Sequence, residues 1–196
     1  GGKRKYIMVQ LPEETPEDSE ARKSGYNTIP EIAKERIRRA GKKIKEESPL
    51  VTQNLDTGFR VFRLADSNFE EVKKAPAEYD QSQLDLFLNN VKSDRTDLDL
   101  LFGAMLSWGV QLSLPMTSEE VDGKMIYSVN DGDLVACFAE DITETIIKTM
   151  ADKQPLRVLF RDSCFGRDDA KINVFETLKQ LLDWSEEEAM KNIKVI

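Results

Sequence analysis

Nucleophilic and acid–base chemistry in this sequence must do without histidine, because none of its 196 residues is one. That absence removes serine–histidine and cysteine–histidine pairs and the most common metal ligand. Cys164 follows Asp162-Ser163, but no imidazole is available to activate its thiol. We therefore expect Cys164 and Cys137 to be reduced structural residues. A hydrolase built on Asp162 and Ser163 has little support.

In the second half of the chain, carboxylates are densest around Ser163–Arg167, where Asp162, Asp168 and Asp169 lie close together in sequence. A hard cation could bind such a group, but the spacing fits no calcium loop and lacks the terminal glutamate. We interpret the run as a surface loop at a strand end, and the sequence predicts no metal site.

Hydrophobic patterning predicts the helices and strands of the first third of the chain, which would position its functional residues. Residues 6–11 are almost continuously apolar, which predicts an interior strand of a parallel sheet. Thr28-Ile29-Pro30-Glu31 reads as a capping box that opens an amphipathic helix ending near Ser48-Pro49. Residues 59–64 look like a second strand. The segment is thus a β–loop–α–β unit, and we expect its missing strands in a longer polypeptide.

The rest of the chain has a different character. Residues 67–79 are polar and contain proline, which predicts a linker, and residues 80–196 are predicted to form a compact α+β domain. Asp122-Gly123 and Asp131-Gly132 are hairpin signals between strands. Helices are expected at 81–88, 98–108, 142–150 (with Asp141 as a cap) and 172–182, and strands at 110–114, 124–129, 134–138, 156–160 and 193–196. The predicted fold class is α/β: a partial doubly wound sheet over residues 1–66, followed by this domain.

Short runs along nearly the whole chain resemble one protein family. They include Lys3-Arg4-Lys5-Tyr6-Ile7-Met8-Val9-Gln10-Leu11-Pro12-Glu13, Glu35-Arg36-Ile37-Arg38-Arg39-Ala40, Gly58-Phe59-Arg60-Val61-Phe62, Asp99-Leu100-Leu101-Phe102 and Phe160-Arg161-Asp162-Ser163. In register, these are similar to the C-terminal part of the modification (Mod) subunit of type III restriction–modification systems, an adenine-specific DNA methyltransferase. Any one run alone would be a weak match.

The resemblance implies an activity, a cofactor and partners. The family transfers a methyl group from S-adenosylmethionine to the N6 of adenine in double-stranded DNA. It restricts DNA together with a nuclease–helicase subunit, Res, and a second Mod subunit is expected. Its two hallmark motifs, Phe-x-Gly-x-Gly and Asp-Pro-Pro-Tyr, do not occur in this sequence. In the family both precede the residues present here, so we expect this chain alone to be inactive and to bind the cofactor weakly or not at all.

Two groups of residues are candidates for binding in the parent enzyme. Gln10 and Glu13 follow the first predicted strand, where an acidic residue commonly binds the cofactor ribose; the alternative is that both are ordinary loop residues. Cations of the capped helix could contact DNA phosphates, although a solvated face interleaved with glutamates is the simpler interpretation. These cations are Arg36, Arg38, Arg39, Lys42 and Lys43.

Charge separates the two parts of the chain. Residues 1–48 carry 12 Lys and Arg against 9 Asp and Glu, whereas residues 49–196 carry 16 against 27. The acidity of the second part favours protein binding, either subunit or Res contacts, over DNA binding. A freestanding interaction module without enzymatic activity is the alternative. No apolar run is long enough to cross a bilayer, so a cytoplasmic location is expected.

Overall fold

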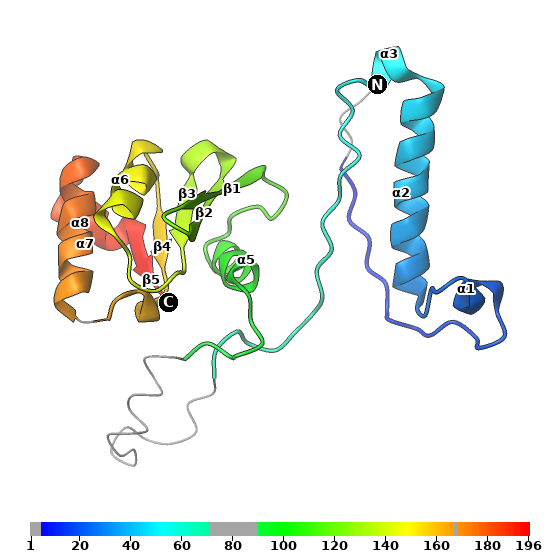
Figure 1. Ribbon diagram of the computed structural model, residues 1–196, viewed down its shortest axis with the longest axis horizontal. Helices are drawn as coiled ribbons and strands as arrows, with labels where there is room; N and C mark the ends of the chain where they lie inside the picture. The colour runs from blue at the N-terminus through cyan, green and yellow to red at the C-terminus, as the bar shows by residue number, and fades with distance from the viewer. Residues whose placement is uncertain (1–4, 71–89, 167) are drawn as a thin grey trace. The chain divides into compact units, whose positions relative to one another are not determined.

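The computed structural model describes residues 5–70, 90–166 and 168–196. The chain divides into two compact units, Gly1–Phe62 and Arg63–Ile196. Figure 1 shows a long helix with its flanking loops in the first unit and a sheet with helices in the second. None of the helices in the described ranges is long and apolar enough to cross a membrane.

Unit 1 is built around the helix α2 (Ile29–Glu47), with two short helices, α1 (Glu20–Lys23) and α3 (Pro49–Thr52). The capping box at Thr28 and Glu31 is present, and α2 ends at Glu47, with Ser48 as its C-cap directly before Pro49. Proline disfavours helical geometry in the residue before it, which accounts for this end. The predicted helix and both of its ends are confirmed.

The loop before α2 is more ordered than its polar composition suggests. Thr15 is 2% exposed, its N–H donates to the carbonyl of Asn27 at 2.9 Å, and its hydroxyl donates to the carbonyl of Tyr26 at 2.7 Å. The Arg22 guanidinium donates to the carbonyl of Thr15 at 2.6 Å. These bonds fix Tyr26 next to the first turns of α2.

The two strands predicted in unit 1 are not formed. Residues 6–11 and 59–64 belong to no sheet in the described part of the chain. Ile7 is 94% exposed and Val9 91%, and Leu64 is fully exposed. The partial doubly wound sheet predicted for residues 1–66 is therefore absent here. A strand is stable only beside neighbouring strands, and unit 1 supplies none.

Unit 2 contains a five-stranded mixed sheet in the order β1-β2-β3-β4-β5. β1 (Met116–Val121), β2 (Lys124–Val129) and β3 (Leu134–Cys137) are joined antiparallel by two hairpins. β4 (Val158–Phe160) and β5 (Ile193–Val195) extend the sheet in parallel. At the first hairpin Asp122 and Gly123 have φ of 51° and 74°, as the turn signal predicted.

Helices cover both faces of this sheet. α6 (Glu144–Asp152), α7 (Asp168–Leu181) and α8 (Glu186–Asn192) pack on one face, around Ile126, Val135 and Phe160. α5 (Asp97–Ser107) packs on the other, around Val129 and Leu159. Short 3-10 helices, η2 (Asn130–Gly132) and η3 (Asp162–Cys164), follow β2 and β4. The mixed α/β character of the predicted fold is confirmed.

Three local predictions in unit 2 differ from the structure. Residues 110–114 form a turn against α5 rather than a strand, and the first strand is β1. α6 is capped by Thr143, whose hydroxyl accepts from the N–H of Ile146, and not by Asp141. α8 was not predicted. The helix expected at 81–88 and most of the predicted linker lie outside the described residues, while Asn68 donates to the carbonyl of Asp99 at 2.8 Å.

Candidate functional site: the cationic face of α2

The five predicted phosphate-binding cations are all exposed on α2. Four of them have an acidic neighbour one turn away: Arg39 and Arg38 at 2.7 and 3.9 Å from Glu35, Lys42 at 3.8 Å from Glu46 and Lys43 at 3.6 Å from Glu47. Exposed pairs of this kind contribute only about 0–1 kcal/mol. An incoming phosphate can therefore replace the carboxylates at low cost.

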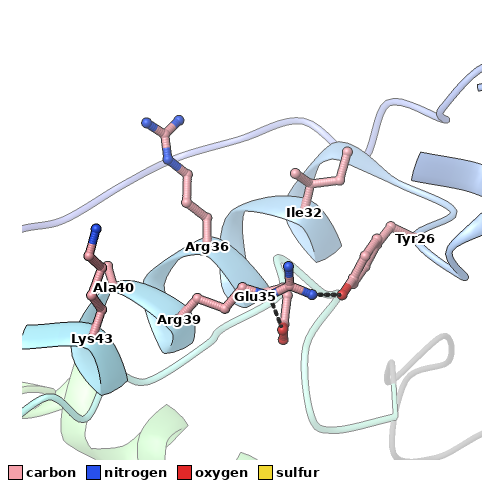
Figure 2. Close-up of a pocket in the computed structure, with 7 residues that line it drawn as sticks. All are labelled: Tyr26, Ile32, Glu35, Arg36, Arg39, Ala40 and Lys43. Carbon is pink, nitrogen blue, oxygen red and sulfur yellow. Dashed lines mark hydrogen bonds and ion pairs between the residues drawn. The ribbon is translucent and has the colours of Figure 1, made fainter. Parts of the chain in front are cut away.

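A hollow of about 430 Å³ opens on this face (Figure 2). Its apolar lining comes from Ile32, Ala40 and the ring of Tyr26, and its charged lining from Arg36, Arg39, Lys43 and Glu35. The residues at positions 32, 36, 39, 40 and 43 share one face because helical neighbours recur every three or four positions.

Arg39 is the most fixed cation of the hollow. Its Nε donates to Glu35 at 2.7 Å, and its Nη2 donates to the hydroxyl of Tyr26 at 3.2 Å. The hydrogen bond to Glu35, followed by the charge interaction with Tyr26, raises the pKa of Arg39. Arg39 is thus held as a fully charged donor over the hollow.

Arg36 differs from Arg39 in pairing with no acidic side chain of the described ranges. It makes no ion pair or side-chain hydrogen bond with any residue in the described ranges, and in Figure 2 its guanidinium stands away from Glu35 and Arg39. A guanidinium presents a planar fork of donors that matches phosphate oxygens. Arg36 is therefore the cation best placed to take an external anion.

The one carboxylate of the hollow, Glu35, is held by Arg39 at 2.7 Å. Two guanidinium groups and one ammonium group border an apolar strip, an arrangement that binds anions through charge and hydrogen bonds. The chemistry supported here is anion binding, and phosphate is one of the anions, with carboxylate, whose geometry arginine forks match.

The predicted cofactor residues lie elsewhere in unit 1. Gln10 and Glu13 are exposed, and neither lines the hollow. The Gln10 amide donates to the neighbouring carbonyl of Leu11 at 3.2 Å, and the carbonyl of Glu13 accepts from the N–H of Ile29 at 2.9 Å. Glu13 is thereby placed beside the start of α2, and the ribose role of both residues stays a prediction.

Sequence reasoning missed Tyr26 and Ile32 as part of this site. Ile32 lies four residues before Arg36, a spacing that was readable from the sequence. Tyr26 reaches the helix through the hydrogen bonds of Thr15 and Arg22, and such a loop conformation has no simple sequence signal.

The other candidates considered in unit 2 were the two cysteines and the acids around Asp162, of which the side chain of Asp168 lies outside the described residues. Cys137 and Cys164 are free and buried, as expected for reduced structural residues, and burial raises the pKa of Cys164 to about 12. Asp162 pairs with Lys171 at 2.6 Å. In the described ranges no three residues of metal-ligand type gather at one point.

Comparison with known proteins shows a partial relationship. The chain is 40% identical over 65 residues to the type III restriction-modification enzyme StyLTI Mod subunit of Salmonella typhimurium. It is 46% identical over 59 residues to the EcoP15I Mod subunit of Escherichia coli. The matches cover 33% and 30% of this chain but only 10% and 8% of those proteins. No family model matches. Part of this chain is therefore related in sequence to type III Mod subunits.

Proposed function

We propose that this chain is the C-terminal part of an adenine-specific DNA methyltransferase of the type III modification class. In this proposal, residues 1–66 complete the S-adenosylmethionine-dependent domain. Residues 80–196, after a linker at 67–79, form an assembly domain that contacts a second Mod subunit or Res. The sequence relationship to Mod subunits supports the class.

The observation that carries the proposal is the lack of a core in unit 1. None of its described hydrophobic side chains is fully buried, whereas Ile7, Val9 and Leu11 are 67–94% exposed. Burying such a side chain stabilises a fold by roughly 1.5–3 kcal/mol, so these residues favour a state in which they are covered. Neighbouring strands of a methyltransferase sheet would cover them, and residues 6–11 and 59–64 would then become strands.

The same arrangement supplies roles for the candidate residues. Gln10 and Glu13 would lie at the carboxyl end of a sheet strand and bind the ribose of the cofactor. Arg36, Arg38, Arg39, Lys42 and Lys43 would contact phosphates of double-stranded DNA, which positions the duplex without reading its sequence.

Two measurements on the purified chain test the proposal. Methyl transfer from labelled S-adenosylmethionine to an adenine-containing duplex should be absent, and calorimetry should show little or no cofactor binding. Clear turnover would overturn the claim that the catalytic motifs must come from elsewhere. In the longer protein, Val9→Asp should abolish methylation while Ser118→Asp, an exposed change in unit 2, should leave it unchanged.

A second candidate is a freestanding interaction module, which the acidity of unit 2 favours. The nucleotide sequence upstream of Gly1 separates the two. A reading frame that continues upstream through a glycine-rich loop and an Asp-Pro-Pro-Tyr motif supports the methyltransferase. A start codon next to Gly1 supports the module.

A further inference from the structure

One edge of the sheet in unit 2 combines an apolar groove with backbone groups that pair with no strand of the described ranges. β5 is the last strand of the sheet (Figure 1). The N–H of Ile196 donates to the carbonyl of Phe160 at 3.0 Å, and the carbonyl of Ile196 accepts from the N–H of Asp162 at 2.8 Å. Both backbone groups of Ile196 therefore face β4 and the residues that follow it. Successive residues of a strand alternate in direction, so the N–H and carbonyl of Val195 face outward.

A groove of about 240 Å³ lies beside this edge. Met190 of α8 is 63% exposed, and Phe165, Phe175 and Val195 are half-buried. The lining is apolar except for one lysine: it consists of Phe160, Phe165, Lys171, Val174, Phe175, Met190, Ile193 and Val195. A pocket next to an open strand edge is the arrangement that accepts an extended peptide, with the backbone pairing and one side chain inserted.

The charge around the edge is opposite to that of its domain. Lys191 and Lys194 are exposed and make no ion pair with any residue of the described ranges. Lys171, which lies on the groove itself, pairs with Asp162 at 2.6 Å. Of the carboxylates of α8, Glu186 pairs with Lys179 at 2.7 Å and Glu188 bonds Ser185 as a helix cap, while Glu187 lies exposed in the first turn. Residues 189–196 thus carry two lysines and no aspartate or glutamate, and they form a basic strip in a predominantly acidic second unit.

This strip argues against pairing with a second copy of the chain. Two β5 strands paired antiparallel around Lys194 would place like charges opposite each other, which destabilises a strand pair. An acidic strand removes that repulsion and supplies carboxylates for Lys191 and Lys194.

We infer that β5 is a docking edge for an extended acidic segment of a partner protein, which adds to the sheet as a further strand. An aliphatic or aromatic side chain of that segment occupies the groove, and its flanking carboxylates face Lys191 and Lys194. The inference specifies the assembly role proposed for unit 2 and rests on it. Its test reads peptide binding and not methylation, so its failure leaves the methyltransferase proposal standing.

The test uses the full chain and two fluorescein-labelled peptides. One has the sequence Glu-Asp-Val-Leu-Val-Asp-Glu, and in the other lysine replaces every acidic residue. Fluorescence anisotropy should show binding of the acidic peptide and at least tenfold weaker binding of the basic one. In NMR spectra the amide shifts on titration should concentrate at residues 190–196. Equal binding of both peptides, or shifts concentrated elsewhere, would overturn the inference.

Variants locate the contact. Lys194→Glu reverses the charge at the edge, and Val195→Pro removes the outward N–H. Each change should weaken binding of the acidic peptide at least tenfold. Lys148→Glu, the same charge change on α6, should leave binding within twofold. Urea unfolding checks that each variant folds. If Val195→Pro does not fold, the binding of Lys194→Glu alone tests the inference. Sedimentation that shows a dimer lost on Lys194→Glu would also overturn the inference, because the occupant would then be a second copy.

Discussion

The hydroxyl of Tyr127 donates a hydrogen bond to the carboxylate of Asp97 at 3.0 Å, and this bond ties the middle of β2 to the first turn of α5. Tyr127 is 9% exposed. Burial, and then the charge of Asp97, raise the pKa of Tyr127 to about 12. The hydroxyl therefore stays protonated and remains a donor at every pH of ordinary use.

Removal of that donor should weaken unit 2. Tyr127→Phe keeps the ring in the core but leaves Asp97 to water, and a lost hydrogen bond of this kind costs about 1 kcal/mol. Urea unfolding followed by circular dichroism measures the loss. Tyr6→Phe is the matched control, because Tyr6 is 59% exposed and should not change the midpoint. An unchanged midpoint for Tyr127→Phe would mean that the bond adds nothing.

Stability of unit 2 should fall at high pH. The folded pKa of Cys164 is raised from 9.0 to about 12, and that of Cys137 is also raised, mainly by burial. Below pH 9 both folded and unfolded thiols are protonated and stability is complete. Above pH 9 only the unfolded thiols lose their protons, so stability is lost as the pH rises toward 12.

The size of this effect is open to measurement. Between pH 8 and pH 10 the thiol of Cys164 should lower the free energy of unfolding by about 1 kcal/mol, and Cys137 should act in the same direction. Cys164→Ala should lower stability at pH 8, since a small cavity forms, but should flatten the dependence on pH. A slope that survives in Cys164→Ala with Cys137→Ala would assign the dependence to other groups.

DNA binding by the cationic face of α2 predicts a change in salt dependence. Arg36→Ala should weaken binding of the full chain to any duplex and reduce the slope of log K against log salt by about 1, the change expected for one lost phosphate contact. Arg39→Ala should act similarly, since it also lines the hollow. Lys148→Ala, on α6 of unit 2, is the control. Equal slopes for all four proteins would exclude α2 as a DNA contact.

Local signals explain which parts of the fold were predictable. α2 carries its own start at Thr28 and its own stop at Pro49, so its bounds follow from a few adjacent residues. Residues 6–11 have the composition of an inner strand, yet strand formation depends on partners that unit 1 does not supply. The sequence pattern of such a segment indicates that it favours strand geometry, but it does not determine whether a strand forms.

Unit 2 shows where patterning misleads. Val110, Leu112 and Leu114 alternate like a strand, but they pack around α5 as a turn. β1 follows instead, with residues 117–120 all exposed, so its apolar signal is weak. α8 is short and polar, yet its capping box at Ser185 and Glu188 was readable. In the site, the charges of α2 were predictable and the position of Tyr26 was not.

Two glycines at hairpin turns differ in what a side chain would meet: at one it would meet only backbone strain, and at the other it would also overlap a neighbouring atom. Gly123 has φ of 74°, and a Cβ there would meet no atom within 4 Å. Gly132 has φ of 113°, and a Cβ there would lie 2.6 Å from the carbonyl oxygen of Lys153. That carbonyl belongs to the backbone that leads from α6 to β4, so it cannot rotate away as a side chain would.

Alanine at the two positions should therefore have unequal effects. Gly123→Ala adds only the cost of a left-handed conformation, about 1 kcal/mol. Gly132→Ala adds the overlap with the carbonyl of Lys153, so the turn after α6 must shift. The same turn carries the hydrogen bond from the N–H of Leu156 to the carbonyl of Gly132, at 3.1 Å. The total loss of unfolding free energy should reach at least about 2 kcal/mol. Urea unfolding of both variants measures the difference. If the two losses are equal, the turn after α6 moves freely, and the hairpin between β2 and β3 does not depend on its contact with Lys153.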